Sequence, residues 1–147
     1  MGAVEKAVEA IAEAAVERFI HNHLEECQEH LTFTRNECFE NNEEFDFEFE
    51  LELFVERTLK ASESEMYEAM HEQMDCETTY YYQGIEIIND YGFTESLKAA
   101  NNACFNLDST NECQIAYFVL SENLPSMESI EEMILYEIKC KLKKEDN

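Results

Sequence analysis

The sequence predicts an α+β fold in which about four helices pack on a small, mainly antiparallel sheet. Two observations support this. Apolar residues recur at helical spacing near both ends of the chain, and a segment in the first half alternates strictly between apolar and acidic residues. The chain has 147 residues and is 45% hydrophobic, enough for one domain with a core. We therefore predict a single domain over residues 1–147.

Helices are predicted where apolar residues follow steps of three and four. The longest is predicted over residues 3–31, with the stripe Val4, Val8, Ile11, Ala15 and Phe19. Another is predicted over 62–74, where Ser62 and Glu65 fit a capping box. Two more are predicted over 95–105 and 126–142, so that the first and last helices pack on the sheet.

Three segments are predicted as strands. In residues 45–57 (FDFEFELELFVER) the apolar side chains would share one face and the acidic side chains the other, with Phe54 as the one break. The run 114–120 (QIAYFVL) is nearly continuous in apolar residues and fits a central strand. Residues 78–82 fit a further strand, whereas 85–91 are ambiguous.

The charge is extreme in magnitude. The chain has 34 acidic and 10 basic residues, a formal net charge of −24. Such an excess repels nucleic acid and anionic membrane surfaces, so direct binding to either is not expected. Ordinary solubility needs a net charge of only about 2–8 in magnitude. The composition therefore favours a basic partner over the simpler interpretation, a solvated acidic surface.

The acids concentrate in residues 25–56, which hold twelve acids and one base, Arg35. On a strand, Asp46, Glu48, Glu50 and Glu52 would form a row of carboxylates about 6.6 Å apart, similar to a line of phosphates. Acids of the predicted 3–31 and 62–74 helices would extend this surface. The predicted partner-binding residues are Glu25, Glu26, Glu29, Glu43, Glu44, Asp46, Glu48, Glu50, Glu52, Glu63, Glu65, Glu68 and Glu72.

The cysteines and the N-terminal segment indicate a cytoplasmic protein. The first residues are charged and lack the apolar core of a signal peptide, and no stretch has the length and apolarity of a membrane span. The six cysteines are scattered, without a C-x-x-C pair, and are predicted to be reduced thiols.

A metal site or an enzyme is the weaker interpretation. His23, Cys27 and His30 fall at i, i+4 and i+7 of a predicted helix and could face one zinc ion, with Cys38 as a fourth ligand. The same residues also border the apolar stripe, where a core cysteine and a half-buried histidine are ordinary. No hydrolase or phosphate-loop motif is present. We expect no enzyme activity and no cofactor.

By its composition and its acidic segments at 25–56 and 62–77, the chain resembles the DNA mimics of phages and plasmids. Those proteins inhibit restriction enzymes or CRISPR effectors by occupying their nucleic-acid channels. The resemblance includes no motif, so it assigns a role to no residue. It implies an acidic inhibitor in a bacterial host cytoplasm that binds a CRISPR effector or, as second choice, a restriction enzyme, as monomer or homodimer. The alternatives are an acidic interaction or chaperone-like protein unrelated to defence, and a zinc-binding regulator.

Overall fold

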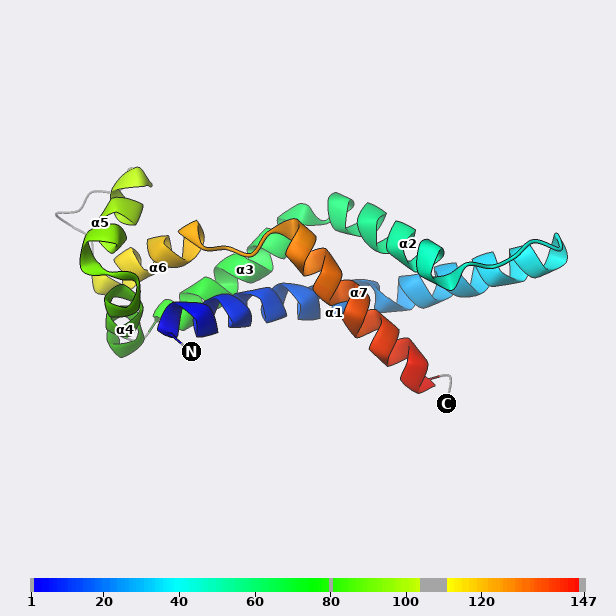
Figure 1. The fold of residues 1–147 in the computed structure, drawn as a ribbon, viewed down its shortest axis with the longest axis horizontal. Helices are drawn as coiled ribbons and strands as arrows, with labels where there is room; N and C mark the ends of the chain where they lie inside the picture. The colour runs from blue at the N-terminus through cyan, green and yellow to red at the C-terminus, as the bar shows by residue number, and fades with distance from the viewer. Residues whose placement is uncertain (1, 80, 104–110, 146–147) are drawn as a thin grey trace. The chain divides into compact units, whose positions relative to one another are not determined.

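The structure is a computed structural model that describes residues 2–79, 81–103 and 111–145. These ranges contain seven helices and no strand (Figure 1). They are α1 (Ala3–Glu40), α2 (Phe47–Ala61), α3 (Glu63–Thr78), α4 (Tyr81–Tyr91), α5 (Phe93–Asn102), α6 (Glu112–Glu122) and α7 (Met127–Glu145). The predicted α+β fold with an antiparallel sheet is therefore wrong, and the described chain is all-helical.

The segment 45–57, predicted as the clearest strand, forms most of α2. Leu51, Val55 and Leu59 are buried at four-residue intervals, which is the spacing of one helix face. Every fourth residue is also an alternate residue, so a two-residue alternation contains a helical stripe within it. Phe49 separates the two interpretations, because a strand would bury it beside Leu51, whereas its side chain is 57% exposed.

The predicted central strand 114–120 lies inside α6. This helix begins with a reciprocal capping box, in which the Asn111 side chain accepts from the Gln114 backbone N–H and the Gln114 side chain accepts from the Asn111 N–H, both at 3.0 Å. The buried residues of α6 are Ala116, Val119 and Leu120, at steps of three and four. The apolar run is continuous because half-buried residues flank this stripe.

The third predicted strand, 78–82, falls where α3 ends and α4 begins. Thr78 is the last residue of α3, and its hydroxyl donates to the Met74 carbonyl oxygen at 2.9 Å. Tyr81 and Tyr82 begin α4, and Tyr80 lies outside the described residues.

The predicted helices are confirmed, with different ends. The helix predicted over 3–31 continues to Glu40 in α1, and that predicted over 62–74 continues to Thr78 in α3. The 126–142 helix corresponds to α7, and the ambiguous segment 85–91 belongs to α4. The 95–105 helix corresponds to α5, which ends at Asn102; residues 104 and 105 lie outside the description.

The chain divides into two compact units. The first comprises Met1–Ala14 and Tyr67–Pro125, and within it α6 packs against α4 and α5. Gly92, with φ of 105°, separates α4 from α5 in a conformation that favours glycine. The Asp90 carboxylate accepts a hydrogen bond of 3.0 Å from the Val4 backbone N–H, which satisfies one free donor at the start of α1.

The second unit comprises Ala15–Met66 and Ser126–Asn147. Here α2 runs back along the last part of α1, and α7 packs against α2 (Figure 1). The core of this unit is built by residues from all three helices, including Phe19, Cys27, Leu31, Leu51, Val55, Leu59, Ile130, Ile134 and Ile138. The prediction of one domain over 1–147 stays a prediction.

Two helices are long enough to be considered as membrane spans, α1 with 38 residues and α7 with 19. Both are rich in acidic residues. No helix in the described part of the chain combines the length and apolarity needed to cross a membrane.

Candidate acidic interface

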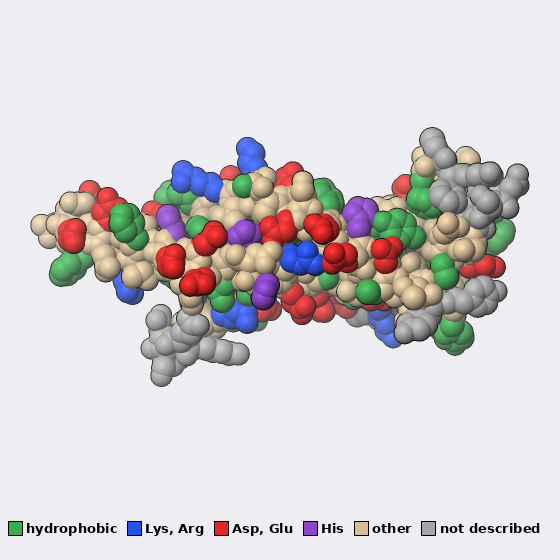
Figure 2. All heavy atoms as spheres, turned by 180° about the vertical axis from the view of Figure 1, so that it is seen from behind, with side chains coloured by type: hydrophobic (Ala, Val, Ile, Leu, Met, Phe, Trp, Pro, Cys, Tyr) green, Lys and Arg blue, Asp and Glu red, His purple; other side chains and the backbone are tan. Residues whose placement is uncertain are grey.

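Residues 25–56, which we call the acidic hairpin, comprise the end of α1, the connecting residues 41–46 and most of α2. Eleven of its twelve acids are exposed, and Glu50 alone is half-buried. Arg35, its one base, is also exposed. Figure 2 shows acidic side chains in red interspersed with hydrophobic side chains in green on the face that it draws. The helices thus carry the predicted acidic surface without a sheet.

The predicted row of four carboxylates is not formed. Asp46 precedes α2 as its N-cap and accepts a hydrogen bond of 3.1 Å from the Phe49 backbone N–H. Glu48 and Glu52 lie one helical turn apart and are both exposed. Glu50 lies on a different side of the helix from these two. Asp46 is also exposed, but it caps the helix, so only Glu48 and Glu52 keep the regular outward spacing that a strand would give all four.

Glu50 faces α1. Its carboxylate lies 3.4 Å from the His30 Nε2 atom, and both side chains are largely covered. The His30 ring also lies 5.5 Å, centroid to centroid, from the ring of Phe54. Glu50 and His30 therefore belong to the packing between α1 and α2, which limits what Glu50 can offer a partner.

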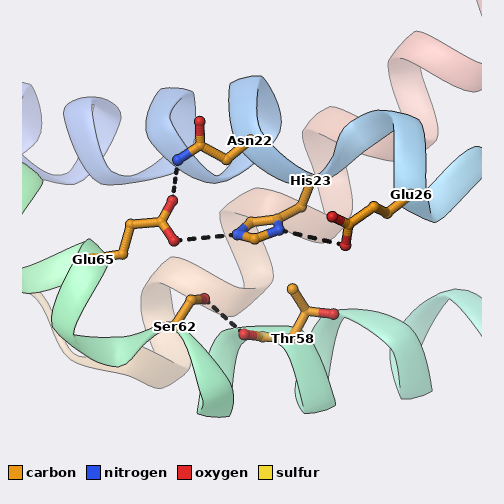
Figure 3. Close-up of polar contacts among 6 residues, drawn as sticks. All are labelled: Asn22, His23, Glu26, Thr58, Ser62 and Glu65. Carbon is orange, nitrogen blue, oxygen red and sulfur yellow. Dashed lines mark hydrogen bonds and ion pairs between the residues drawn. The ribbon is translucent and has the colours of Figure 1, made fainter.

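A second carboxylate–histidine pair joins α1 to the start of α3 (Figure 3). One Glu65 oxygen lies 3.3 Å from His23 Nε2, and the other accepts a hydrogen bond from the Asn22 amide. The other ring nitrogen of His23 lies 3.8 Å from a Glu26 oxygen. The Glu65 side chain therefore points to α1, and the Ser62 hydroxyl donates to the Thr58 carbonyl oxygen at 2.6 Å. These contacts replace the predicted capping box between Ser62 and Glu65.

The weak metal candidate, His23, Cys27 and His30, is not assembled as a ligand set. Cys27 is fully buried, and burial raises its thiol pKa to about 11, which disfavours the thiolate that binds zinc. The two histidines are instead directed at Glu65 and Glu50. Across the described ranges, no group of three or more His, Cys, Asp or Glu side chains is placed to hold a metal ion.

The pKa of Cys38 depends on the negative charge of the acidic hairpin. Partial burial raises the pKa of this thiol, and the nearby carboxylates of Glu43, Glu50 and Glu37 raise it further. A thiolate is disfavoured where the local potential is negative. The same potential attracts a cationic group from a partner.

The remaining predicted binding residues lie on α3, where Glu63, Glu68 and Glu72 are exposed. Glu63 belongs to the second unit, whereas Glu68 and Glu72 belong to the first. On the same helix, the Nδ1 atom of His71 lies 2.6 Å from the Tyr117 hydroxyl oxygen. The thirteen predicted residues are thus divided between the two units.

Sequence reasoning missed a contribution from α7. Glu131 is half-buried there, and its carboxyl pKa is raised by burial and by Glu56, Glu128, Glu52 and Glu132. Acids of α2 and α7 therefore share one field. Because residues 62–126 separate α7 from α2 along the chain, only the packing of the two helices reveals this shared field. The acidic start of α7 was the one signal in the sequence.

Comparison with known proteins gives no relative of this chain: no family model, no curated protein and no solved structure matches it.

Proposed function

We propose that this chain is a non-catalytic acidic protein of the cytoplasm that binds the basic nucleic-acid channel of another protein and excludes its nucleic acid. The observation that carries the proposal is the acidic hairpin, with eleven exposed acids and one base within 32 residues. Like charges held together oppose folding, so a surface with so large an excess of acids is best explained by a function in binding. The second unit as a whole has 21 acidic and eight basic residues, hence a charge of −13.

Helices supply a suitable charge spacing. Acids one turn apart are separated by about 6 Å along the axis, close to the roughly 6.6 Å expected for alternate residues of a strand. Glu25 and Glu29 on α1, and Glu48 and Glu52 on α2, have this spacing and are exposed. The replacement of the predicted strand by a helix therefore changes the layout of the charges more than their density.

The contacts within the chain rank the predicted binding residues. Asp46, Glu50 and Glu65 are engaged with the backbone or the histidines of the protein itself. The better candidates for partner contact are the remaining predicted acids of the hairpin, all of them exposed: Glu25, Glu26, Glu29, Glu43, Glu44, Glu48 and Glu52. Two of these make long ion pairs, Glu26 with His23 at 3.8 Å and Glu48 with Lys139 at 4.0 Å. Such groups act mainly by steering association, and more strongly where the complex excludes water from them.

CRISPR effectors are the preferred target class, because their guide and target channels are long and positively charged. Restriction enzymes come second. In either case the mechanism is competition: the exposed carboxylates occupy Lys and Arg side chains that otherwise bind phosphates.

Affinity capture tests this proposal. The immobilised protein is exposed to a bacterial lysate that contains nucleases and CRISPR complexes, and the bound proteins are identified by mass spectrometry. We expect nucleic-acid-binding proteins that are released when double-stranded DNA is added. If added DNA releases none of the captured proteins, the competition mechanism is wrong.

Two variants with the same net charge test whether capture depends on the acidic hairpin. The hairpin variant changes Glu25, Glu29, Glu48 and Glu52 to Gln. The control variant changes Glu9, Glu13, Glu86 and Glu122, exposed acids of the first unit, to Gln. We expect the hairpin variant to bind the captured target at least about tenfold more weakly and the control much less so. Equal binding by both variants would show that net charge, not the hairpin, determines capture.

A further inference from the structure

Three phenylalanines of the acidic hairpin are exposed where a soluble protein normally buries them. Phe33 is 67% exposed, Phe39 84% and Phe49 57%. Phe33 and Phe39 lie in the last turns of α1, and Phe49 lies in the first turn of α2. Single exposed apolar residues are ordinary, but several large ones in one short region are typical of an interaction site.

A pocket adjoins this region. Its volume is about 390 Å³. Leu31, Phe45, Phe47 and Leu142 provide its apolar lining, and Gln28, Thr32 and Arg35 provide its polar lining. Phe47 is itself 36% exposed. The α1 residues that line this pocket share one helix face, and Phe33 lies on a different face, so the pocket is not part of the surface that carries the exposed rings.

The surrounding charge defines what can cover these rings. Exposed acids lie along the same segments: Glu29, Glu37, Glu40, Glu43, Glu44 and Glu48. A second copy of this chain would bring the same acids against them, and an anionic lipid surface would also be repelled. The complementary occupant is apolar on one side and positively charged at its edges.

We propose that the end of the acidic hairpin binds a basic amphipathic helix of a partner protein. Apolar side chains of that helix contact Phe33, Phe39 and Phe49, and its Lys and Arg side chains meet the acids. The inference deepens the proposed function, on which it rests for the location of the site. It adds that recognition includes an apolar contact that salt does not screen.

The test uses two synthetic peptides of about five helical turns. The first places Leu on one helix face and Lys on the other, and the second has the same Lys residues with every Leu changed to Gln. Binding to the full chain is measured by calorimetry at about 0.15 M and 0.5 M salt. We expect the Leu peptide to bind at least about tenfold more tightly than the Gln peptide, and this ratio to persist at the higher salt.

Matched variants locate the contact. One carries Phe33→Ala, Phe39→Ala and Phe49→Ala. The control carries Tyr67→Ala, Tyr82→Ala and Phe93→Ala, which are exposed aromatic residues of the other unit. We expect the first variant to lose the preference for the Leu peptide and the control to retain it. Both are confirmed as folded by circular dichroism and thermal unfolding.

The proposal is overturned if the wild type binds both peptides equally, or if the Phe33, Phe39 and Phe49 variant keeps the preference. It is also overturned if sedimentation finds a wild-type dimer that the same variant loses, because the phenylalanines would then be covered by a second copy. No nucleic acid enters this experiment. A capture experiment in which DNA releases nothing therefore refutes the competition mechanism and leaves the peptide result standing.

Discussion

The imidazole of His30 lies 3.4 Å from the carboxylate of Glu50, so an acid predicted on the outer face of a strand contacts α1 instead. The neighbouring acids Glu48 and Glu52 are exposed, as a helix requires when residue 50 faces inward. The secondary structure of one segment thus decides which of its acids can meet a partner.

Leu51 and Phe49 provide a direct test of that secondary structure. A strand would bury both on one face, whereas the helix buries Leu51 fully and leaves Phe49 57% exposed. We expect Leu51→Ala to lower the free energy of unfolding by about 2–5 kcal/mol. Phe49→Ala should change it by only about 0.5 kcal/mol. Urea denaturation measures the free energy of unfolding of both variants. A similarly large loss of stability in the two would support the strand.

The N-cap of α2 gives a second test. Asp46 accepts from the Phe49 backbone N–H at 3.1 Å, so Asp46→Ala should destabilise the protein by about 1 kcal/mol. Asp46→Asn removes the same charge but keeps a good capping side chain, and should cost much less. Thermal unfolding measures both. Equal effects would mean that the charge of Asp46, not its hydrogen bond, matters.

The sequence predicted helices well where apolar residues repeat over many turns, as in α1 and α7. It failed where the apolar run was short, because Leu51 and Val55 satisfy both a two-residue and a four-residue period. Cap residues would have helped: Asp46 before α2, and Asn111 with Gln114 at α6, are signals that favour helices. The pairing of His30 with Glu50 could not be predicted from the sequence, because it depends on how α1 and α2 pack.

Thiol reactivity tests the packing of α1. Cys27 is fully buried with its pKa raised to about 11, whereas Cys76 is exposed. At about pH 8 we expect a thiol reagent to modify Cys76 quickly and Cys27 only as the protein unfolds. Mass spectrometry of modified peptides follows each site, with Cys76→Ser as a control for the fast phase. Rapid labelling of Cys27 in the folded protein would contradict its place in the core.

The α2–α7 contact makes stability depend on pH through Glu131. Burial, and then the carboxylates of Glu56, Glu128, Glu52 and Glu132, raise its pKa in the folded protein. Between the ordinary Glu pKa, about 4.3, and the raised pKa, the folded state keeps a proton on Glu131 that the unfolded state has released. The free energy of unfolding therefore falls as the pH rises through this interval. Glu131→Gln removes this loss because Gln does not ionise.

We therefore expect Glu131→Gln to be more stable than the wild type at pH 7, and the advantage to disappear at a pH below about 4, where Glu131 is protonated in both states. Urea denaturation across this range measures the difference. Glu132→Gln, at the exposed neighbouring position, is the control for loss of one charge. If both variants gain the same free energy of unfolding at every pH, the burial of Glu131 between α7 and α2 has no special effect. The general repulsion among the acids would then explain the gain in stability.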